Sequence, residues 1–184
     1  LPKPSGNLQH EAESNLSEMN TLFARARELM IRASTSTLDA AGKSAVMAEL
    51  SSIRTSVHDM LYEKDYQGIP VYDDTISTMV PVSRGLTLEV VGTRQSIEGG
   101  MTVNSVSRTL DDILLEAYNA VNSGLQVDRD NSMASLEVGL NHVILQQSVQ
   151  GIRRDRLETA KDQNTGIQLD LKERRSGLED TDLT

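Results

Sequence analysis

Residues 132–176 read SMASLEVGLNHVILQQSVQGIRRDRLETAKDQNTGIQLDLKERRS, and this stretch decides the fold class. Apolar residues recur in it at steps of three and four, which is the pattern of one buried helix face. No proline interrupts the pattern, although Gly139, Gly151 and Gly166 weaken it. An unbroken helix over this range would be roughly 65 Å long at about 1.5 Å per residue, more than the width of a compact domain of this size. The stretch therefore predicts a rod, along a seam formed by Met133, Leu136, Leu140, Val143, Leu157, Ala160, Asn164, Ile167 and Leu171.

The N-terminal part of the chain contains two further helical patterns. Both step by four and three residues, as the seam of a coiled coil does. The hydroxyl-rich run 34–37 separates them and favours a helix end, and Asp39 can cap the helix that follows. The short connection predicts an antiparallel helix hairpin after a lead-in loop over residues 1–6. The two seams consist of Ala12, Leu16, Met19, Phe23, Ala26, Met30 and Ala33, and of Val46, Leu50, Ile53, Val57 and Met60.

Between about residues 69 and 106 the pattern changes to that of strands. Residues 78–82 and 86–91 are rich in apolar and β-branched residues, and Ser83-Arg84-Gly85 lies between them as a turn. This predicts a β hairpin with Pro81 on an exposed edge. Every second residue from Leu86 to Val90 is apolar, which predicts one strand face covered by the rod.

A third helix is predicted over about residues 108–122, with Gly124 as its stop signal. Its apolar stripe consists of Leu110, Ile113, Leu114, Ala117 and Val121. Residues 128–132 look like a loop and cap before the long helix, in which Ile167 and Leu171 are expected to face the first two helices.

The expected fold is mainly α with a small β insertion: an elongated antiparallel helical bundle with a β hairpin region. We expect one continuous domain, with N-terminal rod helices over residues 1–68, the β hairpin region over 69–106 and C-terminal rod helices over 107–184.

Composition excludes several functional classes. The net charge of −9 disfavours nucleic acid and anionic membranes as partners, because both need a basic surface. The absence of cysteine excludes thiolate catalysis and cysteine-based zinc sites. His10, His58 and His142 lack metal-ligand spacing, and no catalytic motif occurs. We therefore expect no enzyme activity and no metal or other cofactor.

Three stretches together resemble the flagellin family of bacterial flagellar proteins. Residues 22–33, LFARARELMIRA, resemble the family's helix with an Arg-x-Arg-Glu-Leu core. Residues 34–39 followed by Ala48-Glu49-Leu50 are similar to its loop and second helix start. Residues 175–183, RSGLEDTDL, resemble the run near the C-terminal boundary of the family's rod. The resemblance covers residues 8–68 and 110–183.

The resemblance implies a structural subunit of the flagellum. Residues 80–91 look like the short β insertion of the family's hook–filament junction members, which implies a place between hook and filament. It also implies partners, namely copies of itself, other hook and filament proteins and an export chaperone. The implied location is extracellular, on the flagellum, after export through the flagellar secretion apparatus.

Two charged groups are candidates for a subunit-contact surface, with a solvated helix face as the alternative. They are Arg25, Arg27 and Glu28 near the N-terminus, and Arg153, Arg154 and Arg156 in the long helix.

Two other functions compete with a junction protein: a filament flagellin without its outer variable domain, and a coiled-coil ligand-binding or sensor module. Since Leu1 is not an initiator methionine, we expect a fragment or a processed product. The family's terminal helices, by which its members polymerise, have no counterpart in the sequence. We therefore expect an extended monomer that forms no filaments or rings alone.

Overall fold

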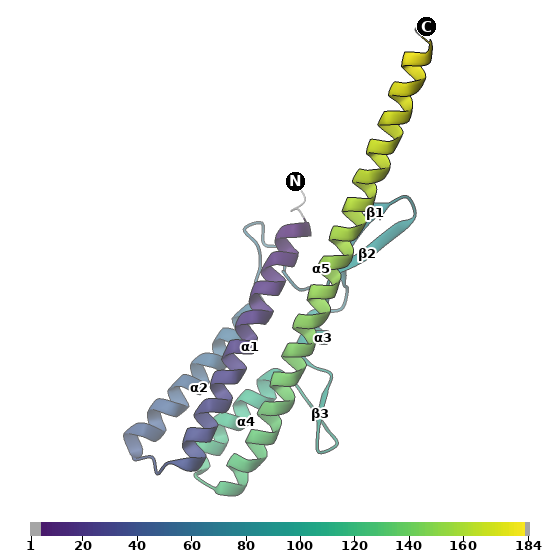
Figure 1. The fold of residues 1–184 in the computed structure, drawn as a ribbon. Coiled ribbons are helices and arrows are strands. Elements are labelled where there is room, and N and C mark those ends of the chain that lie inside the picture. Colours follow the sequence, from purple (N-terminus) through teal and green to yellow (C-terminus); the bar gives the residue numbers. More distant parts are fainter. Residues whose placement is uncertain (1–4, 183–184) are drawn as a thin grey trace.

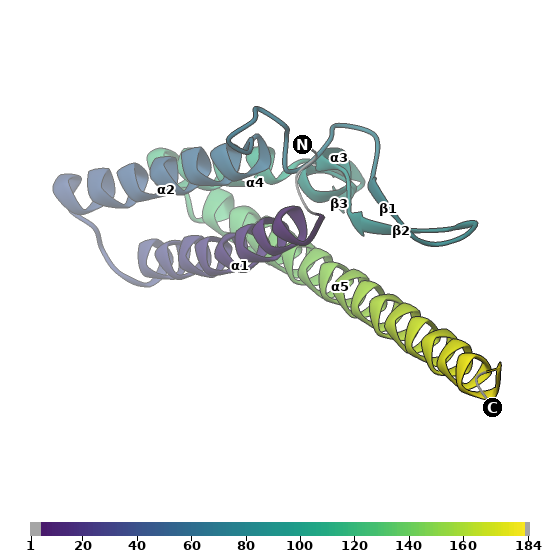
Figure 2. The same cartoon turned by 90° about the horizontal axis from the view of Figure 1, so that it is seen from above.

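The computed structural model describes residues 5–182 and is a rod of antiparallel helices with two small hairpins on its flank. Helix α1 (Ser5–Thr35) runs down the rod, α2 (Ala40–Leu61) runs up, α4 (Leu110–Ser123) runs down and α5 (Gln126–Asp182) runs up again (Figure 1). Helix α1 packs along α5 and α2 along α4, as the view from above also shows (Figure 2). The expected helical rod is confirmed. None of the described helices is long and apolar enough to cross a membrane.

The first helix hairpin follows the predicted seams. Every seam position predicted for α1 and α2 is buried in the common core. Helix α1 ends inside the hydroxyl-rich run, and Asp39 caps α2 by accepting the Gly42 N–H at 2.7 Å. Helix α1 already begins at Ser5, so residues 5 and 6 are not part of a lead-in loop. Residues 1–4 of that loop, and residue 183 of the C-terminal motif, lie outside the described range.

The predicted third helix is confirmed as α4, and strong signals fix both of its ends. Thr109 and Asp112 form a capping box in which each side chain accepts the other residue's backbone N–H, at 3.0 and 2.9 Å. At the other end Gly124 has φ of 69°, a left-handed conformation that glycine adopts without steric cost. All five predicted stripe residues are buried.

The loop predicted over residues 128–132 is wrong. Helix α5 begins at Gln126, so only Gly124 and Leu125 separate it from α4. The polar residues of this segment pair along the first turns: Gln126 donates to Asp130 at 2.6 Å, and Arg129 donates to Gln126 at 2.7 Å. Such spacing of three and four residues supports a helix, so the polar run is the solvent face of α5 rather than a loop.

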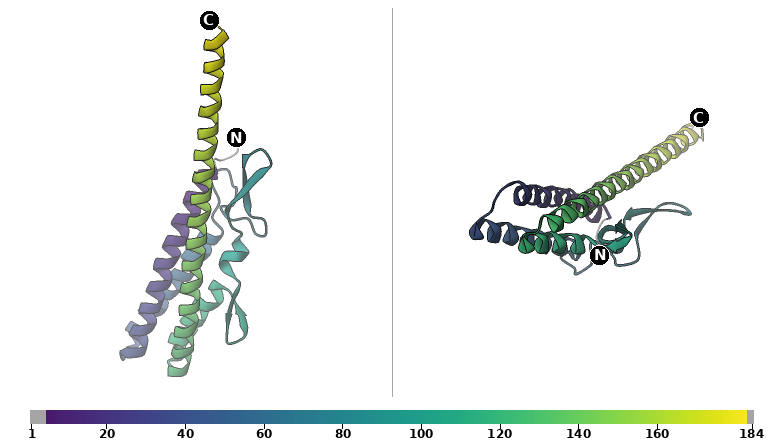
Figure 3. Two further views of the ribbon diagram at one scale, coloured as in Figure 1. Left: turned by 45° about the vertical axis from the view of Figure 1, so that its right-hand side comes forward. Right: turned by 90° about the horizontal axis from the view of Figure 1, so that it is seen from below.

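Helix α5 has 57 residues and is about 85 Å long at 1.5 Å per residue. It passes the start of α1 and continues beyond the bundle (Figure 3). Ile167 and Leu171 do not face the first two helices, because neither helix reaches this far; their exposed fractions are 58% and 57%. Every side chain from 165 to 178 is exposed, and we name this segment the α5 overhang.

The predicted β hairpin is confirmed as β1 (Thr78–Ser83) and β2 (Leu86–Val91), an antiparallel two-stranded sheet. Pro81 is exposed on it, as expected. The predicted alternation in β2 is wrong, because burial increases along the strand instead. Two register shifts in the pairing of β1 with β2 re-aim the side chains, so Leu86 is 47% exposed while Val90 and Val91 are both fully buried.

Three short elements between Gly92 and Thr109 were not predicted. They are α3 (Arg94–Glu98), β3 (Met101–Val103) and β4 (Val106–Arg108). Strands β3 and β4 pair through a two-residue turn in which Asn104 and Ser105 have φ of 50° and 65°. This is the turn geometry that asparagine tolerates, but Asn-Ser is a weaker hairpin signal than Asn-Gly.

The core lies between the four long helices, and Gly139 marks a close approach of α5 to α1 and α4. A Cβ atom there would lie 2.8 Å from the buried Phe23 ring and 3.3 Å from Ile113. Glycine at this position is therefore a packing requirement, although in the sequence it looks like a weak point of the helix.

Candidate interaction surfaces

Arg25 joins α1 to α2 through ion pairs within the chain. Its guanidinium makes two bonds to Glu49, at 2.6 and 3.1 Å, and a third to Glu28 at 3.3 Å. The hydrogen bonds that Arg25 donates to Glu49 raise the pKa of Arg25, and the same contact lowers the pKa of Glu49. Arg27 and Glu28 are exposed. Arg25 is thus mainly a link between two helices, whereas Arg27 and Glu28 face solvent.

Arg153 and Arg154 also hold the molecule together. Arg153 pairs with Glu89 of β2 at 2.9 Å and is only 18% exposed. Gly92 leaves room for it, since a Cβ there would be 2.8 Å from the guanidinium. Arg154 pairs with Glu13 of α1 at 3.0 Å. Arg156 is exposed.

The structure does not bring the two charged groups together. Arg154 meets α1 at Glu13, twelve residues before Arg25, which corresponds to roughly 18 Å along the helix axis. A single contact surface made of all six residues is therefore not present. A contact role for the exposed members, Arg27, Glu28 and Arg156, stays a prediction.

A buried polar contact that the sequence analysis missed fixes the base of the β1–β2 hairpin. Gln9 of α1 and Gln150 of α5 both donate to the Val90 carbonyl oxygen, at 3.2 and 2.6 Å. Both side chains are buried, with exposed fractions of 5% and 1%. Buried amides need such partners, since leaving one unpaired costs about 1–3 kcal/mol. The two helices and the hairpin therefore meet at one carbonyl group.

One further contact holds the hairpin along α5, and another orients Glu89 within the hairpin. Asn164 donates to the Val82 carbonyl oxygen at 2.5 Å, and Ser77 donates to Glu89, the partner of Arg153, at 2.9 Å. The sequence contains a signal for the contacts that Gln150 and Asn164 make with the hairpin. Gln150 and Asn164 lie seven residues before and after Leu157, on the same seam, and a polar residue in an apolar seam indicates a specific partner.

Helices α2 and α4 are joined by a charge pair beside a small cavity. Arg54 binds both carboxylate oxygens of Asp111, at 2.6 and 2.9 Å, and these bonds lower the pKa of Asp111. A cavity of about 180 Å³ lies next to the pair, with Val57, Leu61 and Leu114 in its wall. The pair makes this side of the bundle sensitive to acid.

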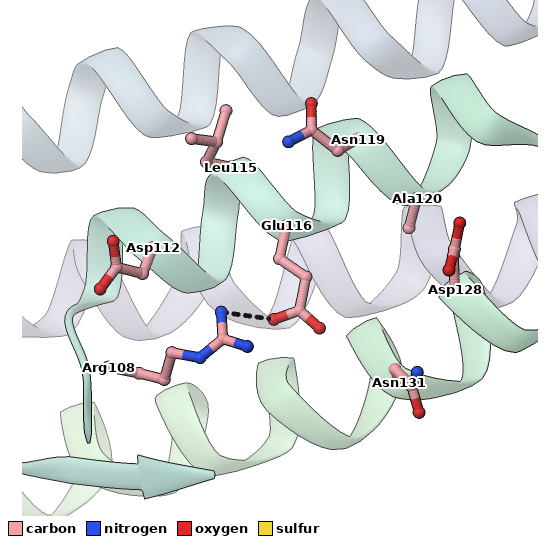
Figure 4. A pocket seen from close by; sticks show the side chains of 8 residues that line it. All are labelled: Arg108, Asp112, Leu115, Glu116, Asn119, Ala120, Asp128 and Asn131. Carbon is pink, nitrogen blue, oxygen red and sulfur yellow. Dashed lines mark ion pairs between the residues drawn. The ribbon is translucent and has the colours of Figure 1, made fainter. Parts of the chain in front are cut away.

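A larger and more open cleft of about 410 Å³ lies between α4 and the start of α5 (Figure 4). Arg108 and Glu116 form an ion pair of 3.2 Å across it. Its other lining residues are Asp112, Leu115, Asn119, Ala120, Asp128 and Asn131. Nowhere in residues 5–182 do three histidine or acidic side chains gather so that they could hold a metal ion. The cleft offers polar contacts and no arrangement of an acid, a base and a nucleophile.

No family model matches the sequence, and no curated protein matches it either. Solved structures do match. Flagellar hook-associated protein-3 from Legionella pneumophila aligns with a TM-score of 0.85 at 12% identity, over 96% of this chain and 93% of that chain. The fold is that of the flagellar junction proteins. FlgL from Xanthomonas campestris aligns at 0.77 with 10% identity, over 94% and 95% of the two chains.

Flagellin from Bacillus cereus shares the same fold at a lower score. It aligns with a TM-score of 0.61 at 14% identity, over 86% of this chain and 85% of that chain. The resemblance found in the sequence is therefore confirmed at the level of the fold.

Proposed function

We propose that this protein is a structural subunit of the bacterial flagellum, at the junction between hook and filament. The observation that carries the proposal is the match to a hook-associated protein-3 structure over nearly the whole of both chains. A match of this extent includes the helices and the flanking hairpins, and not only a pair of long helices.

The internal contacts support a structural role. The helices are joined in pairs by bidentate charge contacts, Arg25 with Glu49 and Arg54 with Asp111. The hairpin is fixed to α1 and α5 by the shared Val90 carbonyl. These contacts support the proposal that residues 1–68, 69–106 and 107–184 form one continuous domain. The protein catalyses no reaction.

The partners under this proposal are further copies of the chain and the neighbouring hook and filament proteins. Before assembly the chain is bound by an export chaperone and passes through the flagellar secretion apparatus. In the assembled organelle it lies outside the cell.

Immunogold electron microscopy tests the proposal. Antibodies raised against the purified chain should label one band where hook meets filament. Label along the whole filament would identify a filament flagellin instead, and label that avoids the flagellum would overturn a flagellar role altogether.

A deletion strain adds an independent measurement. It should keep its hooks, lack filaments and release flagellin into the medium, and a plasmid copy of the gene should restore swimming. Unchanged swimming of the deletion strain would contradict the proposal.

A further inference from the structure

A polar cleft of about 450 Å³ lies at the end of the rod where the chain turns twice. The connection between α1 and α2 and the turn between α4 and α5 lie together at this end (Figure 1). The polar lining of the cleft consists of the hydroxyl-rich run 34–37, Lys43 of α2 and Arg129 of α5. Three helices therefore place polar side chains around one space.

The charge of this cleft is opposite to that of the chain. The net charge of the chain is −9, yet two basic residues line the cleft and none of the residues within 5–182 that line it is acidic. Two other clefts follow the charge of the chain. The cleft beside Arg108 has three acidic residues in its wall, and a cleft between α1 and α5 has two. A positive cleft on an acidic protein favours an anion as its ligand.

Within residues 5–182 neither basic side chain of the cleft forms an ion pair. Lys43 donates to the Asn122 carbonyl oxygen at 2.6 Å, and Arg129 donates to the side-chain oxygen of Gln126 at 2.7 Å. Both acceptors are uncharged, so neither positive charge is compensated. The two bonds also hold both side chains beside the turn between α4 and α5.

The acidic residues closest in sequence are engaged elsewhere. Asp39 accepts the Gly42 N–H at 2.7 Å as the cap of α2, and Asp130 accepts from Gln126 at 2.6 Å. Asp128 lines the cleft beside Arg108 instead. These carboxylates therefore do not fill the cleft with negative charge.

Two donors of the lining residues are buried and have no acceptor within residues 5–182. They are the Nε–H of Arg129 and the hydroxyl of Ser34. Buried polar groups are nearly always hydrogen-bonded, and a charged donor without an acceptor is the most costly case. The exposed hydroxyls of Ser36 and Thr37 lie in the same wall. The cleft thus offers donors and positive charge, and it lacks an acceptor for them.

We propose that this cleft binds a phosphate group, either as inorganic phosphate or as a phosphate monoester. A phosphate group has at least three strong acceptor oxygens, enough for Arg129, Lys43 and Ser34 together, whereas a carboxylate has only two. Arginine and lysine are the side chains that proteins use most for phosphate. The proposal does not depend on the flagellar role, because it concerns a site within one chain.

Titration with inorganic phosphate, followed in ¹H–¹⁵N NMR spectra of the full chain at constant pH and ionic strength, tests the proposal. The backbone amides of residues 34–38 and the Nε–H signal of Arg129 should shift along one saturating curve. A parallel titration with glycerol phosphate distinguishes the two sources. Tighter binding of glycerol phosphate identifies an ester as the ligand, and weaker binding identifies the free ion. Acetate should bind about ten-fold more weakly than phosphate, because it carries less charge and fewer acceptors.

Two variants remove one charge each from the cleft. Arg129→Gln and Lys43→Gln should each weaken phosphate binding by about ten-fold, since each removes a charge-assisted hydrogen bond. The matched control is Arg156→Gln, at an exposed arginine elsewhere on α5, and it should bind phosphate as the wild type does. Circular dichroism checks that every variant keeps its helices.

Three results would overturn the proposal. One is a set of phosphate shifts that spread along the rod without saturating. Another is unchanged phosphate binding in both Arg129→Gln and Lys43→Gln. The third is acetate binding as tight as that of phosphate, which would show that the cleft does not select a phosphate group.

Discussion

Helix α5 covers its seam positions along the bundle, as far as Leu157, whereas the same spacing of residues faces solvent towards its end. Leu136, Val143 and Leu157 are buried against α1, α4 and the hairpin. Ile167, Leu171 and Leu178 continue the same helix face and are between 57% and 69% exposed. The comparison teaches that periodicity specifies a helix and its apolar face, whereas burial depends on whether another element reaches that face.

The largest expected difference between these two parts of α5 comes from truncating a leucine in each. Leu136→Ala should lower the free energy of unfolding by about 2–5 kcal/mol, because it leaves a cavity in a closely packed core. Leu171→Ala should change it by less than about 0.5 kcal/mol, since the side chain is exposed. Urea unfolding of both variants measures the two values, and equal losses would show that the overhang is covered in solution.

Replacing glycine by alanine should lower the stability of the protein at Gly139 and raise it at Gly166. Gly139→Ala places a methyl group against the Phe23 ring and should cost about 1–3 kcal/mol through overpacking. That exceeds the roughly 0.5–1 kcal/mol gained by removing a glycine from a helix. Gly166→Ala meets nothing within 4 Å and should show only the gain.

Thermal unfolding of the two glycine variants shows directly whether each substitution raises or lowers the Tm. Stabilisation by Gly139→Ala would mean that α5 packs less closely on Phe23 than the structure indicates.

Removing a seam amide should have a smaller effect than either core change. Gln150→Leu keeps most of the side-chain volume and leaves Gln9 as a donor to the Val90 carbonyl. The expected loss is about 0.5–1.5 kcal/mol, the net worth of one hydrogen bond. Gln168→Leu in the overhang is the matched control and should be neutral. Faster proteolysis at Arg84 in the Gln150 variant alone would locate the loosened contact at the hairpin.

Acid should destabilise the bundle by protonating Asp111. We expect this effect to be smaller than those of the leucine, glycine and glutamine substitutions. Arg54 lowers the pKa of Asp111 in the folded protein, so the stabilisation is fully present above the unfolded value of about 3.9. It is lost as the pH falls through the lower, folded value. The pair is partly exposed, so its worth is about 0.5–1 kcal/mol.

The Tm of wild type and of Arg54→Met, followed from neutral pH to acid, measures this effect. The difference between them should shrink at the acid end. The exposed Arg27→Met serves as the control, and a constant difference for Arg54→Met would rule out the charge pair as its cause.

The sequence was sufficient for the elements whose signals are local. The seams of α1 and α2, the Asp39 cap and the Gly124 stop need only neighbouring residues to be recognised. The failures concern longer-range geometry. The spacing of Ile167 and Leu171 predicts that both are buried, but no local signal tells where α1 begins relative to them. The sequence predicts a loop over residues 128–132 because a solvated helix face has the same composition as a loop.

The candidate site was the least predictable part. Arg25 and Arg153 look like surface charges in the sequence, yet each has an acidic partner on another element. Those partners, Glu49 and Glu89, are 24 and 64 positions away, so only the fold brings them within reach. Gln150 could have been found, since a buried seam rarely holds an amide without a partner.

The length of α5 beyond the hairpin turns that helix into a lever. From Asn164, which is bonded to the hairpin, to its end at Asp182 it extends about 27 Å at 1.5 Å per residue. A tilt of about 5° at Asn164 would therefore move the far end by about 2 Å, which is comparable to the rise of one residue in a helix. The bond from Asn164 to Val82 thus acts at the fulcrum, where a small change at the hairpin is magnified at the tip of the rod.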